Sequence, residues 1–344
     1  MTDTRALGYA MLLAGHPGVG PRRLAQILAG PGAERGWRDV GGDPLSDPDR
    51  VVATYRAAGV EALLVDDAAY PARLRLDPEP PALLFVRGDL RAAEATSVAI
   101  VGTRRCTGSG AGVARELGRD LTHAGVAIVS GLALGIDGAA HRGVLDAGGA
   151  PVGVVGSGLD VVYPSRHRDL WDAVASAGVL LSEAALGVRP AAWRFPARNR
   201  IIAALADVVV VVESHATGGS MHTVHEAIER DRLVMAVPGS VRSPSAAGTN
   251  QLIAEGCPPV RDATDVLVAL GLTVATRAAT PDPRVRPDAG GRAVLDGFDW
   301  EPATLEHLAV RTGLPLGDLT VTLEMLQATG WVDRVGGWYE RVAT

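Results

Sequence analysis

The chain has 344 residues, of which 47% are hydrophobic and 21% charged, so it is long enough for two or three domains with sizeable cores. No apolar run approaches a membrane span, the N-terminus lacks the features of a signal peptide, and two cysteines are too few for a disulfide framework. We therefore expect a cytoplasmic protein with no membrane association. The net charge of -6 does not indicate a nucleic-acid partner, although all 33 basic residues are arginine, which binds phosphate well.

Residues 1–62 are predicted to form a helical domain. The segment "TRALGYAMLLAG" has helical periodicity, and "HPGVGPRRLAQILAG" supplies a glycine-rich turn and a second helix. The "GVG" turn also suits a helix-hairpin-helix, whose amides can hold a DNA phosphate. A plain packing unit is the preferred interpretation.

Residues 63–272 alternate between apolar runs and helical segments. The strand-like runs are 82–86, 98–102, 126–131, 151–158, 178–183, 207–214 and 233–239. Helices are expected around 110–124, 136–148, 166–177, 198–206 and 223–231. Strands that are apolar throughout are buried on both faces, and their alternation with helices predicts an α/β fold with a doubly wound parallel sheet.

The C-terminal part of the chain is predicted to be a separate module. Residues 273–292 have the composition of a linker, and residues 293–344 contain two helices and a hairpin about a Gly-Gly turn, which is a winged-helix pattern. The second helix, at 315–330, has no basic residue. Between 299 and 341 the sequence has seven acidic residues and only three arginines. Because contacts with phosphate need arginine or lysine, we expect this module to bind a protein rather than DNA. Trp331 and Trp338 could face a partner, although packing on the helices is preferred.

The loops that follow the predicted strands carry the candidate chemistry. In an open parallel sheet, ligands bind beyond the carboxyl ends of the strands. These loops are 102–110, 130–137, 156–168, 182–200, 213–223 and 238–250; each contains glycine, and most contain serine or arginine. Glycine allows the backbone to approach an anion, so the pattern predicts a phosphate-bearing ligand.

Arginines concentrate in the same loops, although residues 98–270 hold 15 arginines against 16 acidic residues. The set is Arg104, Arg105, Arg166, Arg168, Arg194, Arg198 and Arg200. A cation at a helix N-terminus is disfavoured unless an anion lies nearby, which again favours a bound phosphate. The alternative is a ring of salt bridges with Asp160, Asp169 and Glu183.

Several other sites are disfavoured by spacing. The segment "GSGAG" lacks the dinucleotide fingerprint, and without lysine there is no P-loop, so we expect no cofactor. His222 and His225 could ligate a metal, but no third ligand is evident, and Thr223 with Glu226 suits a capping box. Cys106 is expected to be inert. Ser130, Ser157, Ser182 and Ser220 lie outside any nucleophile elbow.

The motifs "VAIVGTR", "SGLALGIDGAAH", "GSGLDVVYP", "LLSE", "FPARNRIIAALAD", "VVVVE", "GGSMHT" and "AVPG" occur in the order and spacing of a known family. Over residues 75–270 the chain resembles the DNA-processing protein A (DprA/Smf) family. Small departures are Thr103 in place of the usual serine, and Met221, His222 and Val224 in the "GGSMHT" segment. The resemblance implies an extended Rossmann-like fold, a SAM-like N-terminal domain and a winged helix.

The resemblance also implies a homodimer without catalytic turnover. It implies a protein that binds single-stranded DNA and loads a RecA-type recombinase in natural transformation. The residues expected to bind DNA are Gly102, Thr103, Arg104, Arg105, Ser130, Gly131, Arg166, Phe195, Arg198, Asn199, Arg200, Gly219 and Ser220. In particular, Ser130 and Gly131 would offer a hydroxyl and amides to a phosphate, whereas Asp137 is expected to be structural. Phe195, Trp193 and Tyr163 are the aromatic candidates for stacking on bases.

An enzyme or sensor of free nucleotides is the alternative. The segment "GGSMHTVHE" partly matches a loop of nucleotide-sugar hydrolases on related folds, with Glu226 as the base. A purely structural interaction module is a third possibility, against which the loop arginines argue.

Overall fold

The computed structural model describes residues 3–272, 284–298 and 302–342. It begins with four helices, α1 (Thr4–Gly15), α2 (Pro21–Ala29), α3 (Ala33–Asp39) and α4 (Pro48–Ala57). The side chains of Asp3 and Asp47 cap α1 and α4, and Pro21 and Pro48 occupy the first turns of α2 and α4, where a missing N–H costs nothing.

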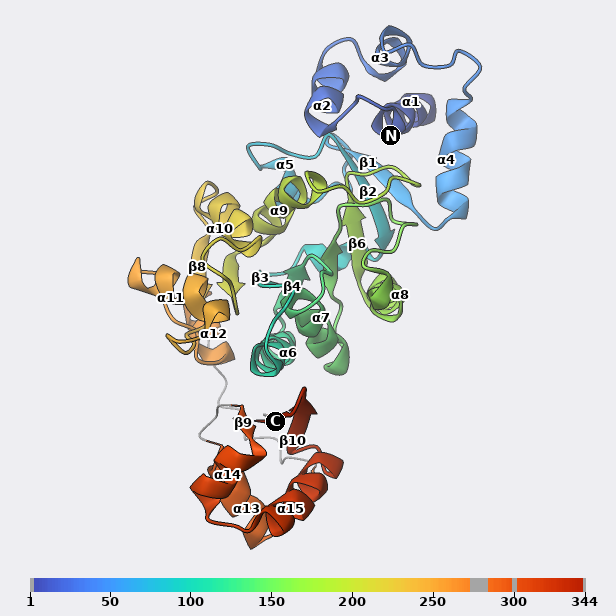
Figure 1. Ribbon diagram of the computed structural model, residues 1–344. Helices are drawn as coiled ribbons and strands as arrows, with labels where there is room; N and C mark the ends of the chain where they lie inside the picture. The colour runs from blue at the N-terminus through green and yellow to red at the C-terminus, as the bar shows by residue number, and fades with distance from the viewer. Residues whose placement is uncertain (1–2, 273–283, 299–301, 343–344) are drawn as a thin grey trace.

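An eight-stranded sheet forms the centre of the molecule (Figure 1). Its strands are β1 (Glu61–Leu64), β2 (Leu83–Gly88), β3 (Ser97–Val101), β4 (Ala127–Ser130), β5 (Val152–Val154), β6 (Val179–Ser182), β7 (Val208–Val211) and β8 (Leu233–Ala236). The spatial order is β1-β2-β6-β5-β4-β3-β7-β8. Each predicted apolar run overlaps one of these strands, which confirms the α/β class.

The sheet is mixed rather than wholly parallel, which corrects one expectation. Strands β6, β5, β4, β3, β7 and β8 are parallel to one another, whereas β2 runs antiparallel to both β6 and β1. Strand β1 was not predicted from the sequence. Because β1 and β2 are separated only by α5 (Ala72–Arg75) and loops, they form an antiparallel extension at one edge of the parallel sheet.

Helices cover both faces of the sheet, as a doubly wound fold requires. One core joins the sheet to α9 (Arg194–Leu205), α10 (Ser220–Ile228) and α11 (Ala247–Ala254). The opposite core contains α6 (Gly108–His123), α7 (Ile136–Asp146) and α12 (Ala263–Ala269). Helix α8 (Arg168–Ala177) packs near β6. Among the described residues, no helix has both the length and the apolar character needed to cross a bilayer.

The N-terminal helices share a hydrophobic core with the sheet. Leu13, Trp37 and Tyr55 belong to one buried cluster with Phe85 of β2 and Trp171 of α8. The Tyr55 and Phe85 rings stack at 5.3 Å between centroids, and the Tyr55 hydroxyl accepts a hydrogen bond from the Leu186 amide at 2.9 Å. This apolar contact fixes the four helices against one end of the sheet (Figure 1).

The C-terminal residues form a small core of their own. It is built from α13 (Ala289–Asp296), α14 (Leu305–Thr312), α15 (Leu316–Ala328) and a three-stranded sheet of β9 (Ala303–Thr304), β10 (Val332–Val335) and β11 (Trp338–Arg341). The two predicted helices and the hairpin are present, but α13 begins inside the predicted linker 273–292, much of which lies outside the described residues. The Trp331 indole donates to the Val285 carbonyl, whereas Trp338 remains 46% exposed.

Candidate nucleic-acid interface

A small hollow lies beyond the carboxyl ends of β3, β4 and β5, next to the point where the strand order reverses. Its volume is about 110 Å³, well below the roughly 300 Å³ at which drug-sized pockets begin, so it suits one phosphate or one base. It is lined by Arg104, Gly131, Ala133, Leu134, Val155, Gly156, Ser157, Tyr163, Pro164, Phe195 and Arg198. Four of the predicted site residues, Arg104, Gly131, Phe195 and Arg198, therefore lie together.

An exposed arginine and two aromatic rings form the rim of this hollow. The Arg104 guanidinium carbon lies 4.7 Å from the centroid of the Phe195 ring, within the range of a cation–π contact. The Tyr163 ring lies 5.5 Å from Phe195, and Tyr163 is 41% exposed. A cation held over an aromatic pair can neutralise a phosphate beside a surface on which a base stacks.

The loop that follows β4 is held by bonds inside the protein, which corrects the role expected for Ser130 and Gly131. The Ser130 hydroxyl donates to the Ile100 carbonyl at 2.6 Å, and the Gly131 amide donates to the Asp137 carboxylate at 3.1 Å. Both residues are buried. In this arrangement neither group is available to a phosphate, while Asp137 has the structural role that was expected of it.

The same loop has an unusual backbone. Leu132 is buried with a φ of 54°, a conformation that costs a branched residue free energy and is maintained only by the surrounding contacts. Its carbonyl lies 3.1 Å from His167 Nδ1. Gly135, with a φ of 78°, precedes α7, and a Cβ there would lie 2.4 Å from the Thr103 carbonyl. The β3 and β4 loops are therefore packed directly against each other.

Arg198, which was expected to bind DNA, lies beneath this loop and is buried in the protein. Only 7% of the residue is exposed, and its Nη1 donates to the Val154 carbonyl. A Cβ at Gly131 would lie 2.0 Å from Arg198 Nη1, so a side chain there would displace the Arg198 guanidinium. Burial lowers the pKa of Arg198 to about 10, which leaves it charged at neutral pH. Burial raises the pKa of Asp137, and the Arg198 charge opposes that rise.

Most of the remaining loop arginines carry no carboxylate partner, so the salt-bridge alternative applies to one of them only. Arg200 donates to Glu183 at 2.6 Å, and both side chains are largely buried. Asp169 instead pairs with Arg142, and Asp160 accepts hydrogen bonds from the Gly187 amide. Within the described ranges, no ion pair is formed by the following five: Arg104, Arg105, Arg166, Arg168 and Arg194.

The other predicted residues are spread along the sheet edge. Gly102 and Thr103 follow β3, the Thr103 amide donates to the Glu213 carbonyl at 2.7 Å, and Arg105 and Arg166 are exposed nearby. Asn199 is half-buried on α9. Gly219 and Ser220 begin α10, and the Ser220 hydroxyl donates to Ser214. Arg200 faces a different, larger cavity.

The N-terminus of α6 is already occupied by a carboxylate. Glu213 accepts hydrogen bonds from the Thr107 amide at 3.0 Å and from the Thr107 hydroxyl at 2.6 Å, and Thr107 caps the helix at Gly110. A carboxylate at this position satisfies the helix dipole. The first loop therefore presents Arg104 and Arg105 rather than helix amides.

The residues weighed for metal or acid–base chemistry have other roles. His225 Nε2 lies 3.2 Å from Glu229, and Glu226 accepts a 2.5 Å hydrogen bond from Arg230. The capping box predicted at Thr223 is wrong, because α10 begins at Ser220 and Thr223 lies inside the helix. Across the described ranges there is no group of three or more residues that could hold a metal ion. His141 is fully buried and burial lowers its pKa to about 4, so it is neutral at pH 7.

The loop after β5, predicted as a candidate loop at 156–168, lines the hollow with residues that were not among those expected to bind DNA. Val155, Gly156, Ser157 and Pro164 line the hollow, and the Tyr163–Pro164 peptide bond is cis. The glycine-rich segment "VVGSG" marked this loop in the sequence, but not the roles of its individual residues.

The fold and this site define a class: an α/β protein whose strand-end loops combine unpaired arginines with aromatic rings. The family model for DNA recombination-mediator protein A matches residues 61–271, and the chain belongs to this family. It is 37% identical over 311 residues to the putative DNA processing protein DprA of Mycobacterium tuberculosis, covering 88% of this chain and 77% of that one. It is 38% identical over 222 residues to DNA processing protein DprA of Bacillus subtilis, covering 64% and 75%.

Two solved structures are similar. The crystal structure of DNA processing protein A from Streptococcus pneumoniae matches with a TM-score of 0.62 and 31% identity, covering 78% of this chain and 98% of that one. DNA processing protein A from Helicobacter pylori, described for its single-stranded DNA binding mode, matches with a TM-score of 0.55 and 28% identity, covering 61% and 95%.

Proposed function

We propose that this protein binds single-stranded DNA along the carboxyl edge of its sheet and acts as a recombination mediator. The observation that carries the proposal is the group formed by Arg104, Phe195 and Tyr163 at the hollow, with exposed Arg105 and Arg166 in the same loops as Arg104 and Tyr163. Bases stack on aromatic rings without regard to sequence, and arginines contact the backbone. The single-stranded DNA binding described for the Helicobacter pylori relative supports the same ligand.

We further propose that the protein protects incoming DNA and delivers it to a RecA-type recombinase during natural transformation, as a homodimer. Membership of the recombination-mediator family supports this role. A binding function of this kind needs no catalytic group. Glu226, the base of the alternative nucleotide-cleaving enzyme, is held in an ion pair by Arg230, which itself also pairs with Asp77. The ion pair argues for the binding role.

Binding is expected to favour single strands over duplex DNA and to weaken steeply with salt. Each phosphate neutralised by an arginine releases counterions, which gives a log–log slope of about -0.7 per contact on single strands. Fluorescence anisotropy with a labelled oligonucleotide and its duplex, each at a low and a moderate salt concentration, measures both quantities. A flat salt response would exclude the arginine-lined edge as the binding surface.

The C-terminal unit is expected to contribute little direct affinity for DNA. It carries Glu340, whose carboxylate lies at the start of α6, where a Cβ on Gly108 would be 2.0 Å from it. Burial, together with the charges of Asp333 and Glu213, raises the pKa of Glu340, which indicates a local excess of negative charge. We interpret this unit as a winged helix with a protein-contact or regulatory role.

Removal of residues 273–344 tests this interpretation. The shortened chain is expected to keep its affinity for a single-stranded oligonucleotide to within about tenfold, or roughly 1.4 kcal/mol. The measurement is a titration of both chains under the same salt conditions. A larger loss would show that the C-terminal unit contacts DNA despite its charge.

A further inference from the structure

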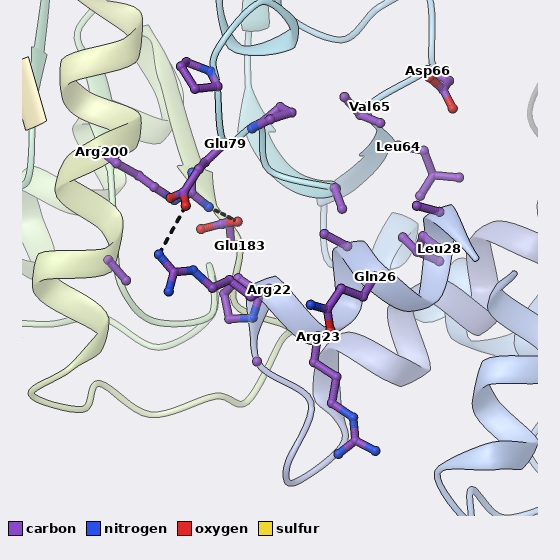
Figure 2. Close-up of a pocket in the computed structure, with 18 of the residues that line it drawn as sticks. Arg22, Arg23, Gln26, Leu28, Leu64, Val65, Asp66, Glu79, Glu183 and Arg200 are labelled. Atoms are coloured by element: carbon purple, nitrogen blue, oxygen red, sulfur yellow. Dashed lines mark hydrogen bonds and ion pairs between the residues drawn. The ribbon is translucent and has the colours of Figure 1, made fainter. Parts of the chain in front are cut away.

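A second, much larger cavity lies on the other side of α9 from the hollow. Its volume is about 1320 Å³, and it lies between α2, residues 64–66 and 78–82, and the exposed sides of α9 and α10. We call it the α2 groove. Figure 2 shows its walls, with Gln26 and Leu28 of α2 opposite the ion pairs formed by Glu79 and Glu183. The groove thus joins the N-terminal helices to the sheet domain.

The α2 groove and the hollow lie on either side of a third, very small space. A narrow space of about 20 Å³ between them is lined by Gly156 and Arg198, which also line the hollow, and by Pro21 and Trp193, which also line the groove. The three spaces therefore follow the first turns of α9 from Arg104 to α2. A strand that follows this side of the sheet edge from the hollow to the groove passes Trp193, which lines both the small space and the groove.

Trp193 stands at the junction of the narrow space and the groove. Its side chain is 52% exposed, and the Arg194 guanidinium carbon lies 4.4 Å from its ring centroid. Arg194 forms no ion pair with any other described residue, and partial burial lowers its pKa. This pair repeats the arrangement of Arg104 over Phe195. An exposed indole with a cation over it is a platform on which an unstacked base can bind.

The groove walls suit bases more than phosphates. Three of their four carboxylates are paired: Glu183 with Arg200 at 2.6 Å, Glu79 with Arg22 at 3.1 Å, and Glu226 with Arg230; the fourth is Asp66. Figure 2 shows Arg22 directed at Glu79, while Arg23 points away from that pair. Leu28, Leu64 and Val65 supply apolar surface. Paired carboxylates can accept hydrogen bonds from base amino groups but would repel a phosphate placed against them.

We propose that the α2 groove is a second DNA subsite, in which Trp193 and the α2 wall receive bases of the strand that is held at the hollow. This inference rests on the proposed function. It assigns to the N-terminal helices a direct part in holding single-stranded DNA. A short oligonucleotide fills the hollow alone, and a longer one continues past Trp193 into the groove.

The test is a length series of oligothymidylates, from about 4 to about 16 nucleotides, titrated against the full chain and its variants. Trp193→Ala is expected to bind the shortest oligonucleotides normally and the longest about tenfold more weakly, since one stacked base is lost. Gln26→Glu, which adds a negative charge to the α2 wall, is expected to weaken only the longer ones. Trp338→Ala, which removes an exposed tryptophan of the C-terminal unit, is the matched control and should change neither.

Quenching of tryptophan fluorescence by DNA distinguishes stacking on Trp193 from a purely structural role, because only a base in contact with the indole changes its emission. Long oligonucleotides should quench the wild-type emission, and Trp193→Phe should lose that part of the quenching while keeping its affinity, because phenylalanine still stacks. Equal affinities of Trp193→Ala and wild type at every length, with unchanged quenching in Trp193→Phe, would overturn the second subsite. The proposed function itself fails on a different result, namely no binding of the short oligonucleotides by the wild type.

Discussion

Arg104→Ala is expected to weaken single-stranded DNA binding by about 10- to 150-fold, which corresponds to roughly 1.5–3 kcal/mol for a lost charge-assisted contact. Arg104 is exposed and forms no ion pair with the described residues, and its contact with Phe195 holds it over the hollow. The free energy of unfolding should stay unchanged, because few neighbours depend on this side chain. Anisotropy titration and urea unfolding of the same preparation measure the two quantities.

Arg91→Ala is the matched control for Arg104→Ala. Arg91 is also exposed, but it follows β2 and lies near the amino ends of the parallel strands, paired with Asp89 at 2.5 Å. The variant Arg91→Ala removes the same charge as Arg104→Ala, but at the opposite edge of the sheet. It should therefore bind DNA normally. Equal losses in the two variants would mean that Arg104 acts only through net charge.

The parallel part of the sheet could be predicted because each strand is apolar throughout and is followed by a helix. The runs that became β3 to β8 are bounded by glycine or polar residues, and valine, leucine, isoleucine and alanine predominate in them. Strand β1 (Glu61–Leu64) escaped prediction because it has four residues, is only partly buried and adjoins a helical region. Its antiparallel pairing with β2 is supported by packing against the N-terminal helices. A local sequence pattern does not predict such tertiary packing.

The sequence predicted the location of the candidate site more accurately than the contacts of its individual residues. The rule that ligands bind beyond strand ends located the hollow correctly, because it depends only on topology. The roles of Ser130, Gly131 and Arg198 depend on which way each group points. An arginine in the first turn of a helix can extend toward solvent or turn beneath the neighbouring loop, and the sequence is the same in both cases. Gly131 leaves room for the Arg198 guanidinium, and this packing accounts for the glycine without a bound anion.

Arg198→Ala is expected to lower the free energy of unfolding by about 3–5 kcal/mol. The substitution leaves the buried Asp137 carboxyl without the positive charge of Arg198. The guanidinium bonds the Val154 carbonyl, and its charge opposes the rise that burial causes in the pKa of Asp137. Removing it would also open a space beneath Gly131 and release the loop that forms one wall of the hollow. DNA binding should therefore fall together with stability.

The double variant Arg198→Met, Asp137→Asn separates the structural role of Arg198 from a direct contact with DNA. It fills the space and removes both buried charges, so it should regain most of the stability that Arg198→Ala loses. If the loop is then restored, binding should recover as well, apart from the contribution of the Arg198 charge to the hollow. The measurements are urea unfolding and anisotropy titration of the wild type and both variants. Normal unfolding of Arg198→Ala with greatly weakened binding would instead identify Arg198 as a ligand of the phosphate, as its position in the sequence first suggested.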